Sequence, residues 1–139
     1  MGTVIRPELS SNNKYWVSKH RYYELKHFCL QYPVWKQNVM DSYGSNMTSS
    51  ITERISFVNR PGDPTGRLAL SNIYYSECMK LIERTAVEAD EYLSYYILKA
   101  VTEGLSYTYL KSRLEMPCGR DTYYDRYRRF FWLLSESRK

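Results

Sequence analysis

The chain has 139 residues and a formal net charge of +5, a length that predicts one domain with a modest core. An apolar fraction of 43% and an aromatic fraction of 16% exclude a disordered chain. The apolar runs fall short of a membrane span, and the N-terminus lacks the apolar segment of a secretory signal. We therefore expect a protein of the cytoplasm without membrane contact.

The composition gives no sign of metal or catalytic chemistry. Cys29, Cys78 and Cys118 lie far apart, and no Cys-x-x-Cys pair occurs. His20 and His27 are seven residues apart, with no third ligand nearby. The sequence has no glycine-rich phosphate loop and no carboxylate pair beside a nucleophile. We therefore expect no cofactor, no metal and no enzymatic activity.

Charge is divided unequally along the chain. Residues 106–139 carry eight basic and four acidic residues, a net charge of +4, whereas residues 63–103 carry four basic and seven acidic, a net charge of −3. A concentrated basic segment suits a polyanion, because each phosphate contact releases condensed counterions. The alternative is an ordinary solvated face.

The first half of the chain divides into an arm, a helical hairpin and a loop. Residues 1–17 have no clean period and predict an N-terminal arm. Residues 18–43 predict two helices, with Pro33 ending the first and opening the second. Residues 44–65 are rich in Gly, Ser and Pro and predict a mobile loop.

Residues 66–139 predict the helical core, and the fold class is an all-α small helical bundle. A long helix extends to about Ala86, and Asp90 caps a second helix that ends before Gly104, a residue suited to the left-handed conformation. The expected apolar side of the long helix consists of Leu70, Ile73, Tyr74, Cys78, Leu81 and Ile82.

Residues 106–137 have the pattern of a helix-turn-helix. Ser106 can cap a short helix that reaches Leu114. Pro117 then interrupts the helical pattern, and Gly119 can cap a second helix from Arg120 to about Ser137.

The last helix has two unlike faces, as a recognition helix in the major groove requires. The expected inward residues are Tyr123, Tyr127, Phe130, Phe131 and Leu134. The expected outward residues are Arg120, Asp121, Tyr124, Asp125, Arg128 and Arg129. The alternative is an amphipathic helix that closes a bundle, with its arginines merely solvated.

Roles follow from the side-chain chemistry. Arg120 is placed for guanine or a nearby phosphate, the hydroxyls of Thr122 and Tyr124 suit phosphates, and Arg128 and Arg129 lie far enough along the helix to meet the DNA backbone. The predicted DNA-binding residues are Lys111, Arg113, Arg120, Asp121, Thr122, Tyr124, Arg128 and Arg129.

Two segments resemble the phage RinA/ArpU-type late-gene transcription regulators. They are Tyr23–Leu25 with the corner Tyr32–Trp35, and Tyr109–Lys111 with Met116–Leu134. The resemblance covers about residues 18–42 and 70–137. It implies a domain like sigma-factor region 4 that reads promoters through Arg120, Asp121, Thr122, Tyr124 and Arg128. The chain departs from the family pattern at Gly119, where the family suggests Ser, and at Asp121 and Asp125.

The sequence therefore predicts a DNA-binding transcriptional regulator, an activator of phage late genes in the bacterial cytoplasm. Its expected partner is double-stranded DNA. The acidic middle helices are candidate contacts for host RNA polymerase or for a homodimer. The alternative is a phage protein-interaction module, or an inhibitor of a host protein, that does not bind DNA.

Overall fold

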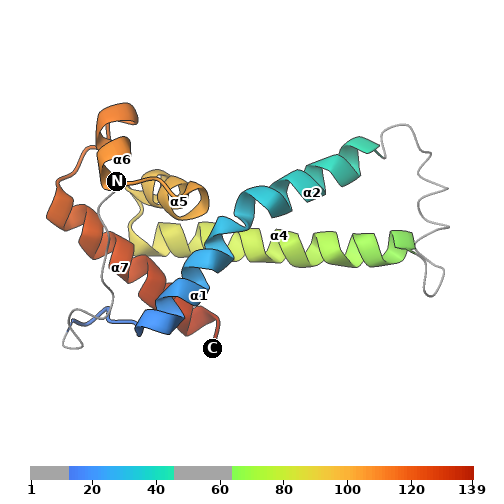
Figure 1. Ribbon diagram of the computed structural model, residues 1–139, viewed down its shortest axis with the longest axis horizontal. Coiled ribbons are helices and arrows are strands. Elements are labelled where there is room, and N and C mark those ends of the chain that lie inside the picture. The colour runs from blue at the N-terminus through green and yellow to red at the C-terminus, as the bar shows by residue number, and fades with distance from the viewer. Residues whose placement is uncertain (1–12, 46–63) are drawn as a thin grey trace. The chain divides into compact units, whose positions relative to one another are not determined.

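The computed structural model describes residues 13–45 and 64–139, and every regular element in these ranges is a helix (Figure 1). The helices are α1 (Lys19–Leu30), α2 (Tyr32–Ser45), α4 (Pro64–Ala89), α5 (Ser94–Glu103), α6 (Tyr107–Arg113) and α7 (Arg120–Ser137). The predicted all-α class is thus confirmed. The predicted loop of residues 44–65 and the arm of residues 1–17 lie mostly outside the described residues.

The contacts divide the chain into two compact units. One unit takes residues up to Gln31 together with Leu81–Lys139, and the other takes Tyr32–Lys80. The boundary between α1 and α2 therefore falls inside the predicted hairpin of residues 18–43, and α4 contributes to both units.

The unit built from α2 and the first part of α4 has an aromatic contact at its centre. Trp35 is buried, and its ring stacks on that of Tyr75, with the centroids 6.2 Å apart. The expected apolar side of α4 is wrong in this part, because Leu70, Ile73 and Tyr74 are exposed. The buried side is shifted around the helix by one position, toward Tyr75 and away from Tyr74.

The other unit contains α1, the end of α4, α5, α6 and α7. Helices α1 and α7 lie against each other, and both contact α5 (Figure 1). Leucine and phenylalanine side chains fill the centre, where Leu25, Leu110, Phe130 and Leu134 are fully buried. Four apolar residues at helical spacing, Leu93 at the N-cap of α5 and Ile97, Ala100 and Val101 within it, are buried.

Side-chain and backbone signals set the helix ends in this unit. The Ser106 hydroxyl oxygen accepts a hydrogen bond from the Tyr109 N–H at 3.2 Å, as an N-cap does. The Asp90 carboxylate accepts from the N–H groups of Tyr92 and Leu93, at 2.9 and 3.0 Å. These bonds fix a turn at residues 91–93, so α5 begins at Ser94 and not at Glu91 as predicted.

Two glycines at helix ends have opposite requirements. Gly104 ends α5 with φ +70°, in the left-handed region that side chains disfavour. Gly119 precedes α7 with φ −81° and ψ 174°, and a Cβ there meets no atom within 4 Å.

The same substitution at these two sites has opposite expected effects. Gly104→Ser lowers the free energy of unfolding by about 1 kcal/mol, because a side chain is strained at positive φ. Gly119→Ser raises it by several tenths of a kcal/mol, because the hydroxyl can cap the free N–H groups of α7. Urea denaturation of both variants measures the difference. If the free energy of unfolding changed with the same sign in both variants, the assignment of these two caps would be contradicted.

Candidate nucleic-acid interface

Helices α6 and α7 are joined by a short connection, residues 114–119, whose own contacts hold its shape. The Lys111 ammonium donates hydrogen bonds to the carbonyl oxygens of Met116 and Cys118, both at 3.0 Å. The Met116 N–H donates to the Leu110 carbonyl at 3.1 Å, and the Met116 side chain is buried. Glu115 adopts φ +54°, which turns the backbone before Pro117. The connection is thus fixed by a lysine and a buried side chain.

The start of α7 presents polar side chains to solvent. Arg120, Asp121 and Thr122 are exposed, and Asp125 and Arg128 are half-buried farther along the helix. Arg113 is exposed at the end of α6. Of the residues predicted to face outward, Arg120 and Asp121 are thus exposed, and Asp125 and Arg128 are partly covered.

Arg120 is ordered by its aromatic neighbours. The guanidinium carbon lies 4.9 Å from the centroid of the Tyr107 ring and 5.9 Å from that of Tyr124. A guanidinium stacked in this way has lost much of its rotamer freedom while its edge keeps its donors. Arg120 is therefore held in place at the N-terminus of α7.

The predicted outward position of Tyr124 is wrong. Its side chain is only 8% exposed and packs against Tyr107 and Tyr123, with centroid distances of 6.0 and 5.2 Å. The apolar stripe of α7 is wider than predicted because α6 places Tyr107 beside it. Tyr124 is thus part of the core, and its hydroxyl is buried without a hydrogen-bond partner in the described structure.

Other predicted cations are engaged within the protein. Arg129 donates from Nη1 to the Tyr15 hydroxyl at 3.1 Å, and this hydrogen bond lowers the pKa of that phenol. The Tyr15 ring also packs on Trp132, with centroids 5.9 Å apart. Tyr15, near the end of the predicted arm, thus contacts the second half of α7. Lys111, as described above, serves the α6–α7 connection, so neither cation is free to make a phosphate contact in this conformation.

Arg126, which the predicted set omitted, also binds within the protein. Its Nε lies 3.2 Å from an Asp90 carboxylate oxygen, and its Nη1 lies 3.6 Å from Asp125. Asp90 in turn holds the turn before α5, so this ion pair links α7 to that turn. Spacing along the sequence gives no sign of it, because Asp90 and Arg126 are far apart in the chain.

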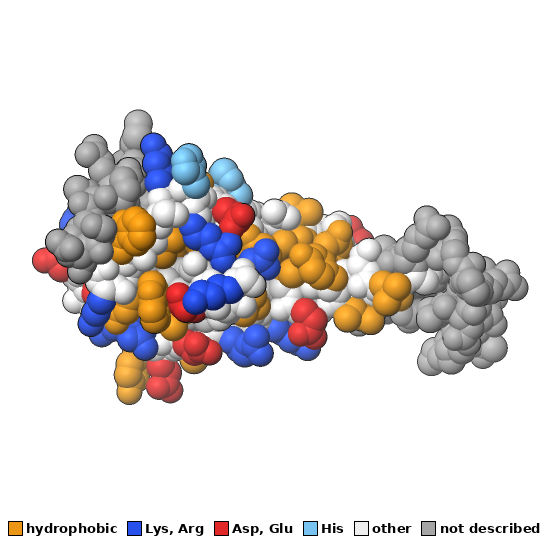
Figure 2. All heavy atoms as spheres, turned by 90° about the horizontal axis from the view of Figure 1, so that it is seen from below, with side chains coloured by type: hydrophobic (Ala, Val, Ile, Leu, Met, Phe, Trp, Pro, Cys, Tyr) orange, Lys and Arg blue, Asp and Glu red, His pale blue; other side chains and the backbone are white. Residues whose placement is uncertain are grey.

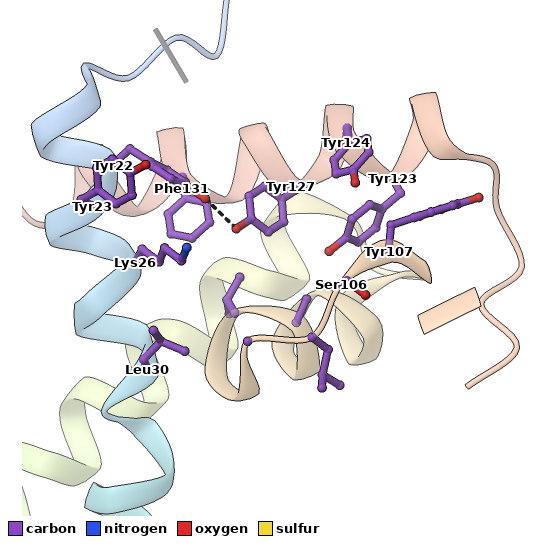
Figure 3. Close-up of a pocket in the computed structure, with 14 residues that line it drawn as sticks. Tyr22, Tyr23, Lys26, Leu30, Ser106, Tyr107, Tyr123, Tyr124, Tyr127 and Phe131 are labelled. Carbon is purple, nitrogen blue, oxygen red and sulfur yellow. Dashed lines mark hydrogen bonds between the residues drawn. The ribbon is translucent and has the colours of Figure 1, made fainter. Parts of the chain in front are cut away.

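Helix α7 packs against α1 through aromatic rings, and an arginine of α1 forms hydrogen bonds with the end of α7. The hydroxyls of Tyr22 and Tyr127 are 3.0 Å apart and hydrogen-bonded, and Phe131 packs against both rings with centroids 5.0 Å away (Figure 3). At the other end, Arg21 donates to the Ser135 hydroxyl and to the carbonyls of Ser135 and Arg138, at 2.9–3.1 Å. Sequence reasoning missed Arg21, because nothing local marks it as the partner of a distant helix end.

Within residues 13–45 and 64–139, no group of three or more His, Cys, Asp or Glu side chains is placed to hold a metal ion. None of the described helices combines the length and apolar character needed to cross a membrane. No protein-family model, curated protein or solved structure matches the chain. The geometry and charges of α6 and α7 therefore carry the functional interpretation.

Two tyrosine hydroxyls in this region have opposite expected contributions to stability. Tyr124→Phe removes a buried, unpartnered hydroxyl and raises the free energy of unfolding by about 1 kcal/mol. Tyr22→Phe removes the hydrogen bond to Tyr127 and lowers it by about 1 kcal/mol. Denaturant unfolding compares the two variants with the wild type. A loss of stability in Tyr124→Phe as large as in Tyr22→Phe would show that the Tyr124 hydroxyl has a partner.

Alkaline pH is expected to destabilise the unit that contains α1 and α7. Burial raises the pKa of Tyr22, Tyr123 and Tyr127 above the ordinary value of a phenol. The unfolded chain therefore loses these protons first, so stability is complete below about pH 10 and falls above it, by up to about 1.4 kcal/mol per pH unit for each group. Urea unfolding at increasing pH measures the slope. A free energy of unfolding that stays constant above pH 10 would contradict the burial of these phenols.

Proposed function

We propose that this chain binds duplex DNA through α6 and α7 and regulates transcription. The observation that carries the proposal is the exposed first turn of α7, which holds Arg120 and Thr122 beyond a connection fixed by Lys111. A helix that presents its N-terminal residues after a short, rigid connection has the form of a recognition helix.

Each outward residue has a chemical role in this proposal. Arg120 donates to guanine O6 and N7 or to an adjacent phosphate, and its stacking on Tyr107 reduces the entropy lost on binding. Thr122 and Arg113 contact phosphates, and Asp121 accepts from cytosine N4. Arg128 lies two turns, or about 12 Å, farther along α7 and meets the backbone.

The resemblance to RinA/ArpU-type regulators extends the proposal to activation of phage late genes. Under this reading, the acidic stretch of residues 63–103 contacts host RNA polymerase or a second copy of the chain. Because acidic residues lie among the basic ones, we expect the protein on its own to bind DNA with modest affinity. Figure 2 shows a face of the molecule on which basic and acidic side chains are interspersed, without a single large basic patch.

A protein-interaction module without DNA binding is the second candidate. Exposed tyrosines favour it, since Tyr92, Tyr95 and Tyr109 are 89%, 53% and 45% exposed. Tyrosine is enriched at protein interfaces because it buries a ring and keeps a polar end. This function requires a stable protein complex and no salt-sensitive binding to DNA.

Fluorescence anisotropy with a labelled random-sequence duplex tests the proposal, and selection from a random pool then reports base preference. The wild type is expected to bind with an affinity that falls steeply as salt rises. Arg120→Ala is expected to weaken binding about tenfold or more, and Arg120→Lys is expected to keep the phosphate attraction but lose discrimination at one base.

Two control variants make the test specific to the outward face. Arg84 is exposed on α4, outside the proposed interface, and Tyr124 is buried behind it. Arg84→Ala and Tyr124→Phe are therefore expected to bind DNA as the wild type does. Absence of salt-sensitive binding by the wild type would refute the proposed function. Equal affinity of Arg120→Ala and the wild type would refute the role given to Arg120.

A further inference from the structure

A pocket of about 230 Å³ opens behind the apolar face of α7 (Figure 3). Its walls come from α1, from the connection between α5 and α6, and from α7, all within one compact unit. Apolar side chains such as Leu30, Val101 and Leu105 form part of the lining. Aromatic rings form much of the rest, with six tyrosines and Phe131 among the lining residues.

The pocket carries one cation and no anion among the residues that line it. Lys26 is the charged residue, and no carboxylate is present in the lining. The ion pairs of the described residues do not include Lys26. Its ammonium lies 5.8 Å from the centroid of the Tyr23 ring, and Figure 3 shows it directed toward the side of the pocket that holds Tyr127. Lys26 therefore brings to the pocket a positive charge that is not in an ion pair with any residue of 13–45 or 64–139.

Two tyrosine hydroxyls add a hydrogen-bond donor to the lining of the same pocket. In the pair formed by Tyr22 and Tyr127, one hydroxyl donates to the other, so the proton of the accepting hydroxyl is left for a further acceptor. Burial raises the pKa of both phenols, which keeps both protons in place at neutral pH. One ammonium and one phenolic donor in the lining of the same pocket favour an anionic acceptor, and the rings in that lining favour an aromatic body.

The volume limits the size of the occupant. A cavity of about 150 Å³ accommodates benzene, and sites for drug-sized ligands begin at about 300 Å³. The pocket lies between these values. We propose that it binds a monocyclic aromatic carboxylate, with the ring between Tyr123, Tyr127 and the apolar lining and the carboxylate on the Lys26 ammonium.

Such a ligand contacts three segments of the unit, which lie on different sides of the pocket. It contacts α1 through Lys26, the α5–α6 connection near Ser106 and α7 through Tyr127. A ligand that binds only the folded state stabilises it by RT ln(1 + L/Kd), where L is the free ligand concentration. The pocket is a separate site from the proposed contact with DNA, since Arg120, Asp121 and Thr122 are exposed and do not line it, although Tyr107 and Tyr124 contact both the pocket and Arg120.

Isothermal titration calorimetry with benzoate as the probe, and with no DNA present, tests the proposal. Benzoate is expected to bind the full chain saturably at one site and to raise the midpoint of thermal unfolding. Benzamide, which keeps the ring and loses the charge, is expected to bind about tenfold more weakly or worse. Equal affinity for the two probes would overturn the assignment of a carboxylate site.

Variants locate the binding. Lys26→Met is expected to weaken benzoate binding at least about tenfold, because a charged hydrogen bond is lost. Lys19→Met removes an exposed cation on the same helix, outside the lining, and is expected to leave the affinity unchanged. Leu30→Trp adds bulk in the pocket and is expected to abolish binding. Circular dichroism confirms that each variant is folded.

Besides equal affinity for the two probes, three results would overturn the proposal: no saturable binding by the wild type, unchanged affinity in Lys26→Met, or an equal loss in Lys19→Met. The last would indicate attraction to surface charge in place of a pocket. Because the titration contains no DNA, its failure leaves the proposed recognition helix untouched. Failure of the DNA titration likewise leaves the pocket untouched.

Discussion

The seam between α1 and α7 is the constraint on which the C-terminal half of the structure depends. Rings of Tyr22, Tyr127 and Phe131 meet there, and the hydrogen bond between the two hydroxyls satisfies polar groups that would be costly to bury alone. Arg21 fixes the far end of α7 through carbonyl oxygens that the helix itself leaves unpaired. With the second half of α7 held in this way, its first turn is the part left to face solvent.

The same seam determines which arginines of α7 are engaged within the unit. Arg126 and Arg129 lie on the flanks of the buried stripe, close enough to Asp90 and Tyr15 to bind them. The positive charge that faces solvent is thus less than the count of arginines in α7 indicates. Arg120 is the exposed arginine of the helix and lies at its N-terminus, where the helix dipole also favours an anion.

Local signals in the sequence were sufficient for most helix ends. Ser106 and Gly104 act through bonds or backbone angles within a few residues of themselves, so their roles can be deduced from the chain alone. The outward face of α7 was only partly predictable. Tyr124 lies at the edge of the stripe, and its burial depends on where α6 places Tyr107. A helical wheel of α7 contains no information about that neighbour.

Contacts between distant segments could not be predicted from the sequence for the same reason. Lys111 looked like a phosphate ligand because it is basic and near the turn, but the turn itself supplies two carbonyl acceptors for its ammonium. The assignment of α1 and α2 to different compact units could not be predicted from the sequence either. Pro33 marks a helix boundary, which the structure places one residue earlier, but a proline says nothing of which neighbours each helix joins.

Mixed charge on the outward face bears on how a DNA-binding form of this protein would work. Asp121 and Asp125 offset part of the attraction that Arg120 and Arg128 exert on phosphates, so binding to random DNA is weakened more than binding to a site whose bases match. A low affinity for non-specific DNA raises the ratio of specific to non-specific binding even when both affinities are modest. In the proposed DNA-binding role, residence on a promoter would then need a second contact that adds to the first, such as one made by another protein or another copy of the chain. The acidic stretch of residues 63–103 is poorly suited to DNA and is the part of the chain whose charge fits that second contact.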